Sequence, residues 1–360
     1  MRVTGITDLP LHGGSCPPWL FNRMKGLARE ISRIIIYEYG RREFIKRLSD
    51  PFFFQSLSCV LGFDWHSSGT TTVTTAVLKE SISLDLGIAV CGGKGKRSRA
   101  TPEEIEKAGS LFSLSSNKLE KLKEASKLSA KVDNILVQDD HNLYHHSFIF
   151  SEEGDWIVIQ QGMNENVRTA RRYHWASDNL NSFVEEPHTG IIADRKFENV
   201  LNLVSKKSRE NRKTILDLVK DNPKKIKTYV VDSKQVSLNV FLSNIKYISM
   251  PWKINWNAIY QAYELQPRRF EEFLSIKGIG SSTVRALALI SELIFGKPAD
   301  WKDPAKYSYA HGGKDGVPYR VNLSRMEKTT EILRDAIQNA EIGNKEKINA
   351  LKRLTEFISF

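Results

Sequence analysis

The first regular pattern along the chain is a helical one. Between residues 19 and 47, apolar residues recur every three or four positions: Leu20, Met24, Leu27, Ile31, Ile34 and Ile35. This spacing predicts a helix with one buried face. The run of β-branched residues at 70–78 (TTTVTTAVL) predicts a strand instead. A short buried strand is also expected at 84–91, directly before a glycine-rich loop.

A two-residue alternation predicts a β-hairpin at 143–162. His146, Phe148 and Phe150 alternate with their neighbours, and Glu153-Gly154-Asp155 turns the chain. The apolar run from Trp156 then leads back along the first strand. Later parts of the chain are mainly helical in pattern, with a basic helix expected at about 196–221 and a helical region at 252–300.

These patterns predict a chain of three parts. Residues 1–195 are expected to form an α/β catalytic domain with a mixed sheet, and residues 196–250 a basic helical linker region. Residues 251–360 are expected to form an all-α domain that contains a helix-hairpin-helix. At 360 residues, the chain is long enough to bury more than one core.

The stretch FLSIKGIGSSTVRAL at 273–287 indicates the hairpin. It combines the end of one helix, a glycine turn and the start of another helix, and it resembles the helix-hairpin-helix of DNA repair and replication proteins. Glycines permit backbone angles that other residues rarely adopt, and the N–H groups of a helix N-terminus bind phosphate. The predicted DNA contacts here are Lys277, Gly278, Gly280, Ser281, Ser282, Thr283 and Arg285. A tight turn between two core helices is the alternative interpretation.

The charge of the chain supports a polyanionic partner. The formal net charge is +11, and such an excess favours nucleic acid, most simply DNA. A basic balance alone would also fit a membrane surface or a contribution to solubility. Three cysteines without a CxxC pair indicate neither a disulfide framework nor a cysteine-based zinc site. No signal peptide and no apolar run long enough for a bilayer is visible, so we expect a cytoplasmic protein that does not enter a membrane.

A second basic segment follows the strand expected at 84–91. The loop Gly92-Gly93-Lys94-Gly95-Lys96 contains lysines among glycines, a composition that suits oxyanions, and Lys94 and Lys96 are predicted DNA contacts. The loop matches neither the Walker A pattern nor the dinucleotide-binding fingerprint. A solvated basic loop is an equally good interpretation.

Histidines gather in the first 190 residues, beside carboxylates. One chemistry for such a cluster is a divalent cation, Mg²⁺ or Mn²⁺, that activates water for attack on a phosphodiester. The predicted metal ligands are Asp64, His66, His146 and His188. The other chemistry is metal-free proton transfer by histidine, with arginine stabilising the phosphate charge. The full set of predicted catalytic residues is Asp64, His66, His146, Arg171, Arg172, His174 and His188. The alternative is that these are structural histidines of one large domain.

Several distinctive motifs give the chain a family resemblance. They are His12-Gly13-Gly14, Pro18-Trp19-Leu20, Phe63-Asp64-Trp65-His66-Ser67-Ser68-Gly69, Gly92-Gly93-Lys94-Gly95-Lys96, Gln161-Gly162-Met163-Asn164, Ala170-Arg171-Arg172-Tyr173-His174-Trp175, Glu186-Pro187-His188-Thr189-Gly190 and Ala310-His311-Gly312-Gly313-Lys314-Asp315-Gly316. With them, nearly the whole chain resembles the domain of unknown function family 763 of archaea and some bacteria. The resemblance implies an archaeal or bacterial cytoplasmic setting and a helix-hairpin-helix.

The function we expect is DNA binding in repair or replication, with nuclease activity on structured or damaged DNA. A non-catalytic scaffold that recruits repair factors is the alternative. A lesser alternative is a helix-hairpin-helix DNA glycosylase, because Asp300 follows Gly280 by 20 residues, a spacing similar to that of the catalytic Asp in such enzymes. The sequence Trp301-Lys302-Asp303-Pro304 departs from the glycosylase pattern.

Overall fold

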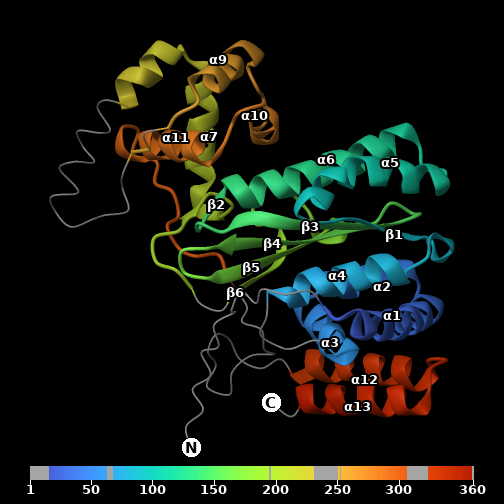
Figure 1. Cartoon of the computed structure of the whole chain (residues 1–360). Coiled ribbons are helices and arrows are strands. Elements are labelled where there is room, and N and C mark those ends of the chain that lie inside the picture. Colours follow the sequence, from blue (N-terminus) through green and yellow to red (C-terminus); the bar gives the residue numbers. More distant parts are fainter. Residues whose placement is uncertain are drawn as a thin grey trace, which may run out of the picture.

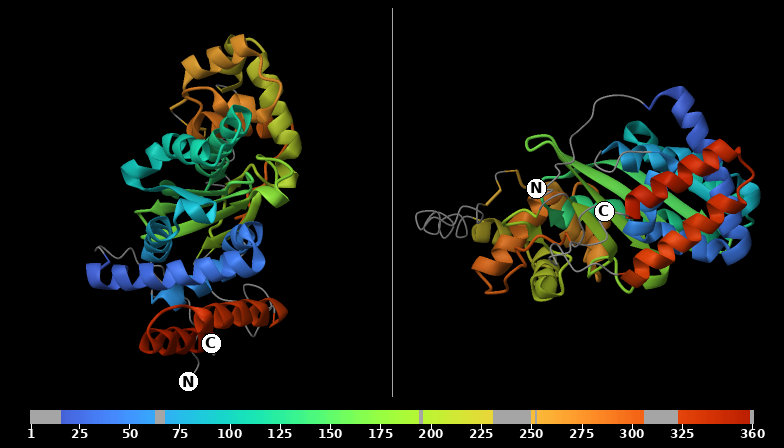
Figure 2. Two further views of the ribbon diagram at one scale, coloured as in Figure 1. Left: turned by 90° about the vertical axis from the view of Figure 1, so that its right-hand side faces the viewer. Right: turned by 90° about the horizontal axis from the view of Figure 1, so that it is seen from below.

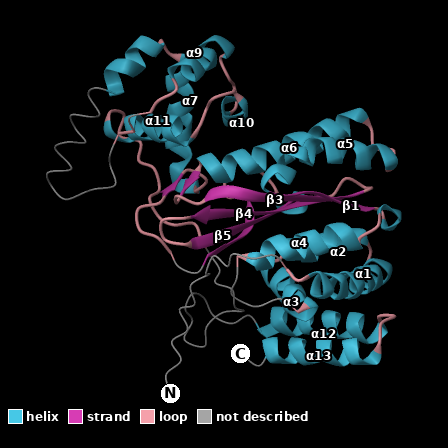
Figure 3. Cartoon of the chain, viewed as in Figure 1, coloured by secondary structure: helices cyan, strands magenta, loops and turns pink. Residues whose placement is uncertain are grey.

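The computed structural model describes residues 16–62, 68–193, 196–230, 250–251, 253–305 and 323–358. At its centre lies an antiparallel five-stranded sheet with the strand order β1-β3-β4-β5-β6 (Figure 3). The strands are β1 (Ile88–Lys94), β3 (Asn142–Ser151), β4 (Trp156–Asn164), β5 (Thr169–Ala176) and β6 (His188–Ala193). A separate two-stranded sheet pairs β2 (Val137–Gln138) with β7 (Leu201–Asn202).

Helices cover both faces of the central sheet. Phe148 and Phe150 of β3 join one hydrophobic core, whereas Ile149 between them joins the other. Successive side chains of a strand point to opposite faces of the sheet, so alternate residues of a strand belong to different cores. Because both faces are buried, the successive residues Phe148, Ile149 and Phe150 of β3 are all apolar.

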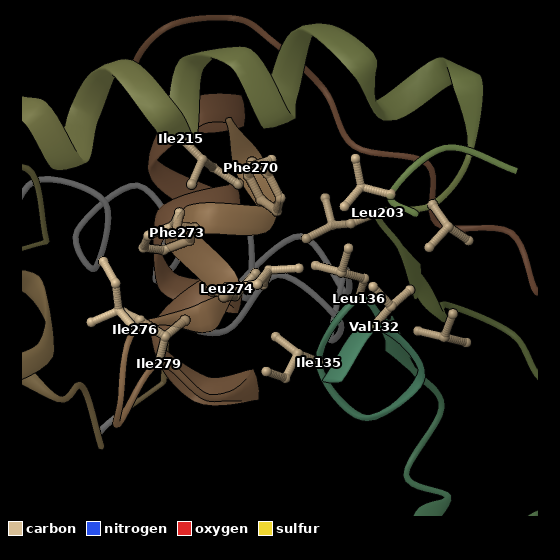
Figure 4. Packing of buried hydrophobic residues seen from close by; sticks show 14 of the residues in the cluster. Val132, Ile135, Leu136, Leu203, Ile215, Phe270, Phe273, Leu274, Ile276 and Ile279 are labelled. Atoms are coloured by element: carbon tan, nitrogen blue, oxygen red, sulfur yellow. The ribbon is translucent and has the colours of Figure 1, made fainter. Parts of the chain in front are cut away.

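The helices of the first face are α5 (Thr101–Leu111) and α6 (Ser116–Ile135), which lie directly on the sheet (Figure 1). Two helices pack against α6, namely α10 (Phe270–Ser275) and α11 (Ser281–Leu293). Helix α7 (Arg209–Lys220) packs against both of them, and α9 (Trp256–Leu265) packs against α7. Residues 223–230 are helical as well. Figure 4 shows Leu274 and Ile279 of the α10–α11 region beside Ile135 and Leu136 at the end of α6. One core therefore joins the glycine turn to the sheet.

The second face is covered by α1 (Pro18–Tyr39), α2 (Arg41–Ser49), α3 (Pro51–Leu61) and α4 (Gly69–Ser81). Two further helices, α12 (Leu323–Asn339) and α13 (Asn344–Ile358), form an outer layer on α1 and α3 (Figure 2). The region predicted as one helical domain at 251–360 is thus divided between the two sides of the sheet. None of the helices in the described ranges is both long and apolar enough to cross a membrane.

Two sequence-based predictions of the fold were wrong. The central sheet is wholly antiparallel, not mixed. The segment predicted as a strand at 70–78 is helix α4. The threonine hydroxyls of α4 find hydrogen-bond partners inside the protein. The hydroxyl of Thr75, for example, donates to the backbone carbonyl of Thr71 (2.8 Å) and contacts the ring of His145 (3.0 Å). Tertiary packing therefore outweighs the β propensity of this run.

The hairpin predicted at 143–162 is confirmed as β3 and β4. The next strand, β5, extends it, and β1 pairs with β3 from the other side. The strand predicted at 84–91 is present as β1, beginning at Ile88. Near the end of β1, Gly92 has φ +89°, and a Cβ atom there would lie 2.2 Å from the carbonyl oxygen of His146.

A substitution at Gly92 tests this close approach. Gly92→Ala should lower the free energy of unfolding by about 1–3 kcal/mol, because a left-handed backbone and a steric clash add together. The measurement is urea denaturation. Gly26→Ala is the matched control, since Gly26 lies within helix α1 and no atom lies within 4 Å of the position that a Cβ would take. The control should gain up to about 1 kcal/mol, and equal effects at both sites would contradict the prediction.

Candidate nucleic-acid interface

The glycine turn lies at the surface between α10 and α11. Gly278 and Lys277 are exposed, whereas Ile279 is buried between the helices. Gly278 has φ +89°, as expected for a glycine turn, and a Cβ there would lie 2.6 Å from Nδ2 of Asn255. Gly280 differs from the expectation, because its φ of −136° is open to any residue. Its lack of a side chain leaves open space, with no atom within 4 Å of a Cβ position.

The first turn of α11 presents backbone N–H groups to the surface. Ser281 and Ser282 are exposed, and the cap residue Gly280 provides no side chain to accept a hydrogen bond from this turn. The first N–H groups of a helix have no acceptor within the helix and lie at the positive end of its dipole. This end of α11 is therefore suited to an anion such as phosphate.

Two of the predicted contacts near this turn pack against other parts of the protein. The hydroxyl of Thr283 accepts a hydrogen bond from the N–H of Asn255 (3.0 Å), and the side chain is buried. Arg285 is half-buried, with its guanidinium 5.2 Å from the ring centroid of Trp301. Burial lowers the pKa of Arg285, against the attraction of Asp140. Among the predicted contacts at the turn, Lys277, Ser281 and Ser282 are the polar residues with exposed side chains.

A groove with a volume of about 700 Å³ lies beside the turn. Three parts of the chain form its walls: the segment before and at the start of α5, the second half of α6 with the start of β3, and the glycine turn. Its lining includes Ile279, Gly280 and Ser281 from the turn, and the cations Arg99, Lys127 and Lys131. The groove therefore places the glycine turn beside two basic segments, the one before α5 and the second half of α6.

Lys131 differs from the other cations of the groove. Its ammonium group donates hydrogen bonds to the carbonyl oxygens of Leu274 and Ile276, at the end of α10. Burial lowers the pKa of Lys131, and repulsion from Lys127 adds a smaller effect in the same direction. Gln138 makes a similar link by donating to the carbonyl oxygen of Ser281 (2.9 Å). These bonds hold the carbonyl groups of the turn against α6 and leave the N–H groups of α11 facing outward.

The basic loop lies at the same end of α5. Lys94, Lys96 and Arg99 are exposed, and Lys94 lies 5.8 Å from the ring centroid of Tyr144, which also lines the groove. The backbone N–H of Gly92 is already bonded to the Glu104 carboxylate (2.6 Å). That N–H is therefore not free for an anion, whereas the lysine side chains of the loop are accessible.

The arginines predicted to meet a scissile phosphate lie in the core. Arg171 is fully buried and paired with Asp139 and, through both of its terminal nitrogens, with Asp303 (3.0 and 2.7 Å). Arg172 is equally buried on the other face, against the side chain of Gln55 (3.2 Å) and the ring of Phe54 (4.7 Å). Such burial gives the prediction of phosphate contacts no support.

The buried carboxylate of Asp139 shows why this arrangement is stable. Burial alone would raise its pKa, but the charge of Arg171 and the hydrogen bonds of His141 outweigh burial and hold the pKa below its ordinary value. A buried charge is costly unless it is paired and hydrogen-bonded, and this one has both kinds of partner.

Three histidines of the cluster also lie in the core. His146 contacts Ser126 (2.8 Å) and Gln160 (2.8 Å), and His145 contacts Thr75. His174 is fully buried, with its ring 5.5 Å from that of Phe54. Burial lowers the pKa of all three imidazoles, and with the charges of His146 and Lys94 it brings that of His145 to about 3.

His145 and His146 line the groove, whereas His188 lines a separate cavity. The Nε2 atom of His188 lies 2.5 Å from the carboxylate of Asp133, which also accepts hydrogen bonds from Trp175 (3.0 Å) and Gln160. Gln160 in turn contacts His146, so His146 and His188 belong to one buried hydrogen-bond network. Asp133 was missed in the sequence, because a single Asp inside a Lys-rich helix has no distinguishing pattern.

The predicted metal site finds no counterpart in the part of the chain that can be described. Asp64 and His66 lie outside the described residues. Among the described ones, no group of three or more His, Cys, Asp or Glu side chains is arranged to hold a metal ion. Asp300 lines a different cavity, of about 210 Å³, and its carboxylate accepts a hydrogen bond from the N–H of Lys302 (3.1 Å). It does not line the groove, which gives the glycosylase alternative no support.

The buried histidines predict a loss of stability in mild acid. Because the folded-state pKa of His145 lies far below the unfolded value of about 6.5, the unfolded chain binds more protons below that pH. This contribution is complete above pH 6.5 and is lost as the pH falls toward 3, at about 1.4 kcal/mol per pH unit. Urea denaturation at pH 7 and pH 5 measures it. His145→Gln should show a smaller loss between the two pH values, and an unchanged loss would contradict this origin.

Comparison with known proteins places the chain in a family. No curated protein and no solved structure matches it. The sequence model of the family described as "Protein of unknown function (DUF763)" matches residues 5–321, which is most of the chain. The resemblance expected from the motifs is thereby confirmed: the chain belongs to the DUF763 family.

Proposed function

We propose that this chain is a DNA-binding protein of repair or replication that holds the sugar-phosphate backbone in the groove beside the glycine turn. One observation carries the proposal: the uncapped N-terminus of α11 and the cations Arg99 and Lys127 line one groove, although they come from three distant parts of the sequence. Contacts of this kind position DNA without reading its bases.

The charges of the groove support a polyanion. Neither Arg99 nor Lys127 forms an ion pair or hydrogen bond with another described residue, and none of the described carboxylates lines the groove. His145 and His146, which also line it, are held neutral by burial. When cations such as these neutralise phosphates, the counterions condensed on the DNA are released. This release favours binding at low salt.

The turn adds a second kind of contact. The N–H groups at the start of α11 are fixed by the helix, and the carbonyl groups of the turn are held by Lys131 and Gln138. A phosphate at this position gains directed hydrogen bonds without ordering a flexible loop, which lowers the entropic cost of binding.

Phosphodiester cleavage is the activity we propose to accompany this binding, and recruitment of repair factors without cleavage is the alternative. The burial of Arg171, Arg172, His146 and His174 favours the alternative. A cleavage centre therefore depends on Asp64 and His66, which lie outside the described residues, and on His188 at a cavity wall.

The substitution Ser281→Asp distinguishes an effect on DNA affinity from an effect on the stability of the fold. A carboxylate at the start of α11 interacts favourably with the helix dipole and should leave thermal stability equal or raise it by about 0.3–1 kcal/mol. The same charge repels phosphate, so the affinity for DNA should fall about 10-fold or more. Fluorescence anisotropy with labelled duplex and single-stranded DNA measures the affinity. An unchanged affinity with intact folding would contradict phosphate binding at this turn.

The double variant Arg99→Ala with Lys127→Ala tests the other wall in the same assay. The slope of log affinity against log salt should become shallower by about 0.9 for each phosphate that the variant no longer neutralises. Lys345→Ala is the matched control, because Lys345 is an exposed lysine on α13, in the outer helical layer. A control with an equally altered slope would show that net charge, rather than the groove, governs binding.

Cleavage is tested with single-stranded, duplex and branched DNA in Mg²⁺, Mn²⁺ or EDTA. If the chain is a metal-dependent nuclease, product should form with the cations and disappear in EDTA, and His66→Ala should form none while it still binds DNA. Tight, salt-sensitive binding without product under every condition would instead support the non-catalytic alternative.

A further inference from the structure

A second cavity lies at the edge of the central sheet, apart from the groove. It has a volume of about 410 Å³, within the usual range of about 300–1,000 Å³ for small-ligand sites. Its walls come from α2 and the start of α3, from the segment leading into β6, and from α12. None of its lining residues lines the groove.

Each carboxylate that lines this cavity has an ion-pair or hydrogen-bond partner within the protein. Glu43 pairs with Arg47 (2.7 Å), and Asp50 accepts a hydrogen bond from the N–H of Phe52 at the start of α3 (2.8 Å). Glu186 accepts one from the N–H of Lys206 (3.2 Å). Each of the three therefore already has a partner other than the lysines of the cavity wall.

Two lysines of the cavity have no protein partner among the described residues. Lys46 of α2 and Lys328 of α12 are exposed on its wall, and neither side chain forms an ion pair, a hydrogen bond or a ring contact with the described part of the chain. Both ammonium groups are therefore available to an anionic group of a ligand. Arg47 adds a buried Nε atom that has no hydrogen-bond partner within the described ranges.

The cavity also has a fixed polar wall. The side chain of His188 is only 6% exposed, and its ring is held by the Asp133 carboxylate and by the edge of Trp175, with ring centroids 4.8 Å apart. Its Nδ1 makes no hydrogen bond with any described residue. This Nδ1 atom suits a ligand hydroxyl group, which can either donate or accept a hydrogen bond.

We propose that this cavity binds a phosphomonoester on a sugar, either as a free nucleotide or as the phosphorylated end of a DNA strand. Lys46 and Lys328 interact with the phosphate as two point charges, which match its charge of about −1.5 to −2 at neutral pH. Nδ1 of His188 forms a hydrogen bond with a sugar hydroxyl. The proposal goes beyond DNA binding in the groove and does not depend on it.

The test titrates the full chain with thymidine 5′-monophosphate and with thymidine, using calorimetry and the shift in melting temperature. We expect saturable binding of the monophosphate, at least about 10-fold tighter than that of the nucleoside. The double variant Lys46→Ala with Lys328→Ala should abolish this difference, and the control Lys345→Ala should keep it. These lysines are exposed, so their replacement leaves the core intact. No saturable binding, or equal binding by the double variant and the wild type, would overturn the proposal.

Two further arms identify the source of the phosphate and separate the cavity from the groove. Tighter binding of a 5′-phosphorylated than of a 5′-hydroxyl oligonucleotide, abolished in the double variant, supports a strand end. Monophosphate binding without this preference supports a free nucleotide. The groove variant Arg99→Ala with Lys127→Ala should keep its affinity for the monophosphate, and a loss there would place the phosphate in the groove and overturn the cavity.

Discussion

Burial of the central sheet on both faces is the constraint from which the other features follow. Helices from the N-terminal part cover one face, and α5 and α6 cover the other. A polar side chain that is buried on such a sheet has no access to water, so its main partners are other groups of the protein. Arg171 has such partners in Asp139 and Asp303, and Asp133 has them in Trp175, Gln160 and His188.

Burial of the sheet on both faces changes the role that we infer for the histidines and arginines. In the sequence, their grouping beside carboxylates is typical of a catalytic centre. In the structure, Arg171 ties β5 to the segment around Asp303, and that segment also bonds to the backbone of Phe197 (2.7 Å). The ion pairs therefore fix distant parts of the chain on the sheet, a structural role in which removal of one partner leaves an uncompensated charge.

Surfaces suited to ligands lie instead at the margins of the sheet, where helices from different parts of the chain meet. The groove forms where the glycine turn approaches the end of α6 and the basic segment before α5. The second cavity forms where α2, α3 and α12 approach β6, the edge strand. In both places, cations without partners in the described ranges lie beside rigid groups, the helix N-terminus in one and the Asp133–His188 pair in the other.

The sequence alone determined the features that depend on local chemistry. The alternation at 143–162 requires a hairpin, Gly278 requires a tight turn, and the family motifs extend through most of the chain. Only the tertiary structure decided which polar residues are buried, since burial depends on helices that cover the sheet from far along the sequence. For the same reason it alone made α4 a helix and brought Arg99, Lys127 and Ser281 to one groove. Local pattern fixes the backbone of an element, but the environment of each side chain depends on what packs against that element.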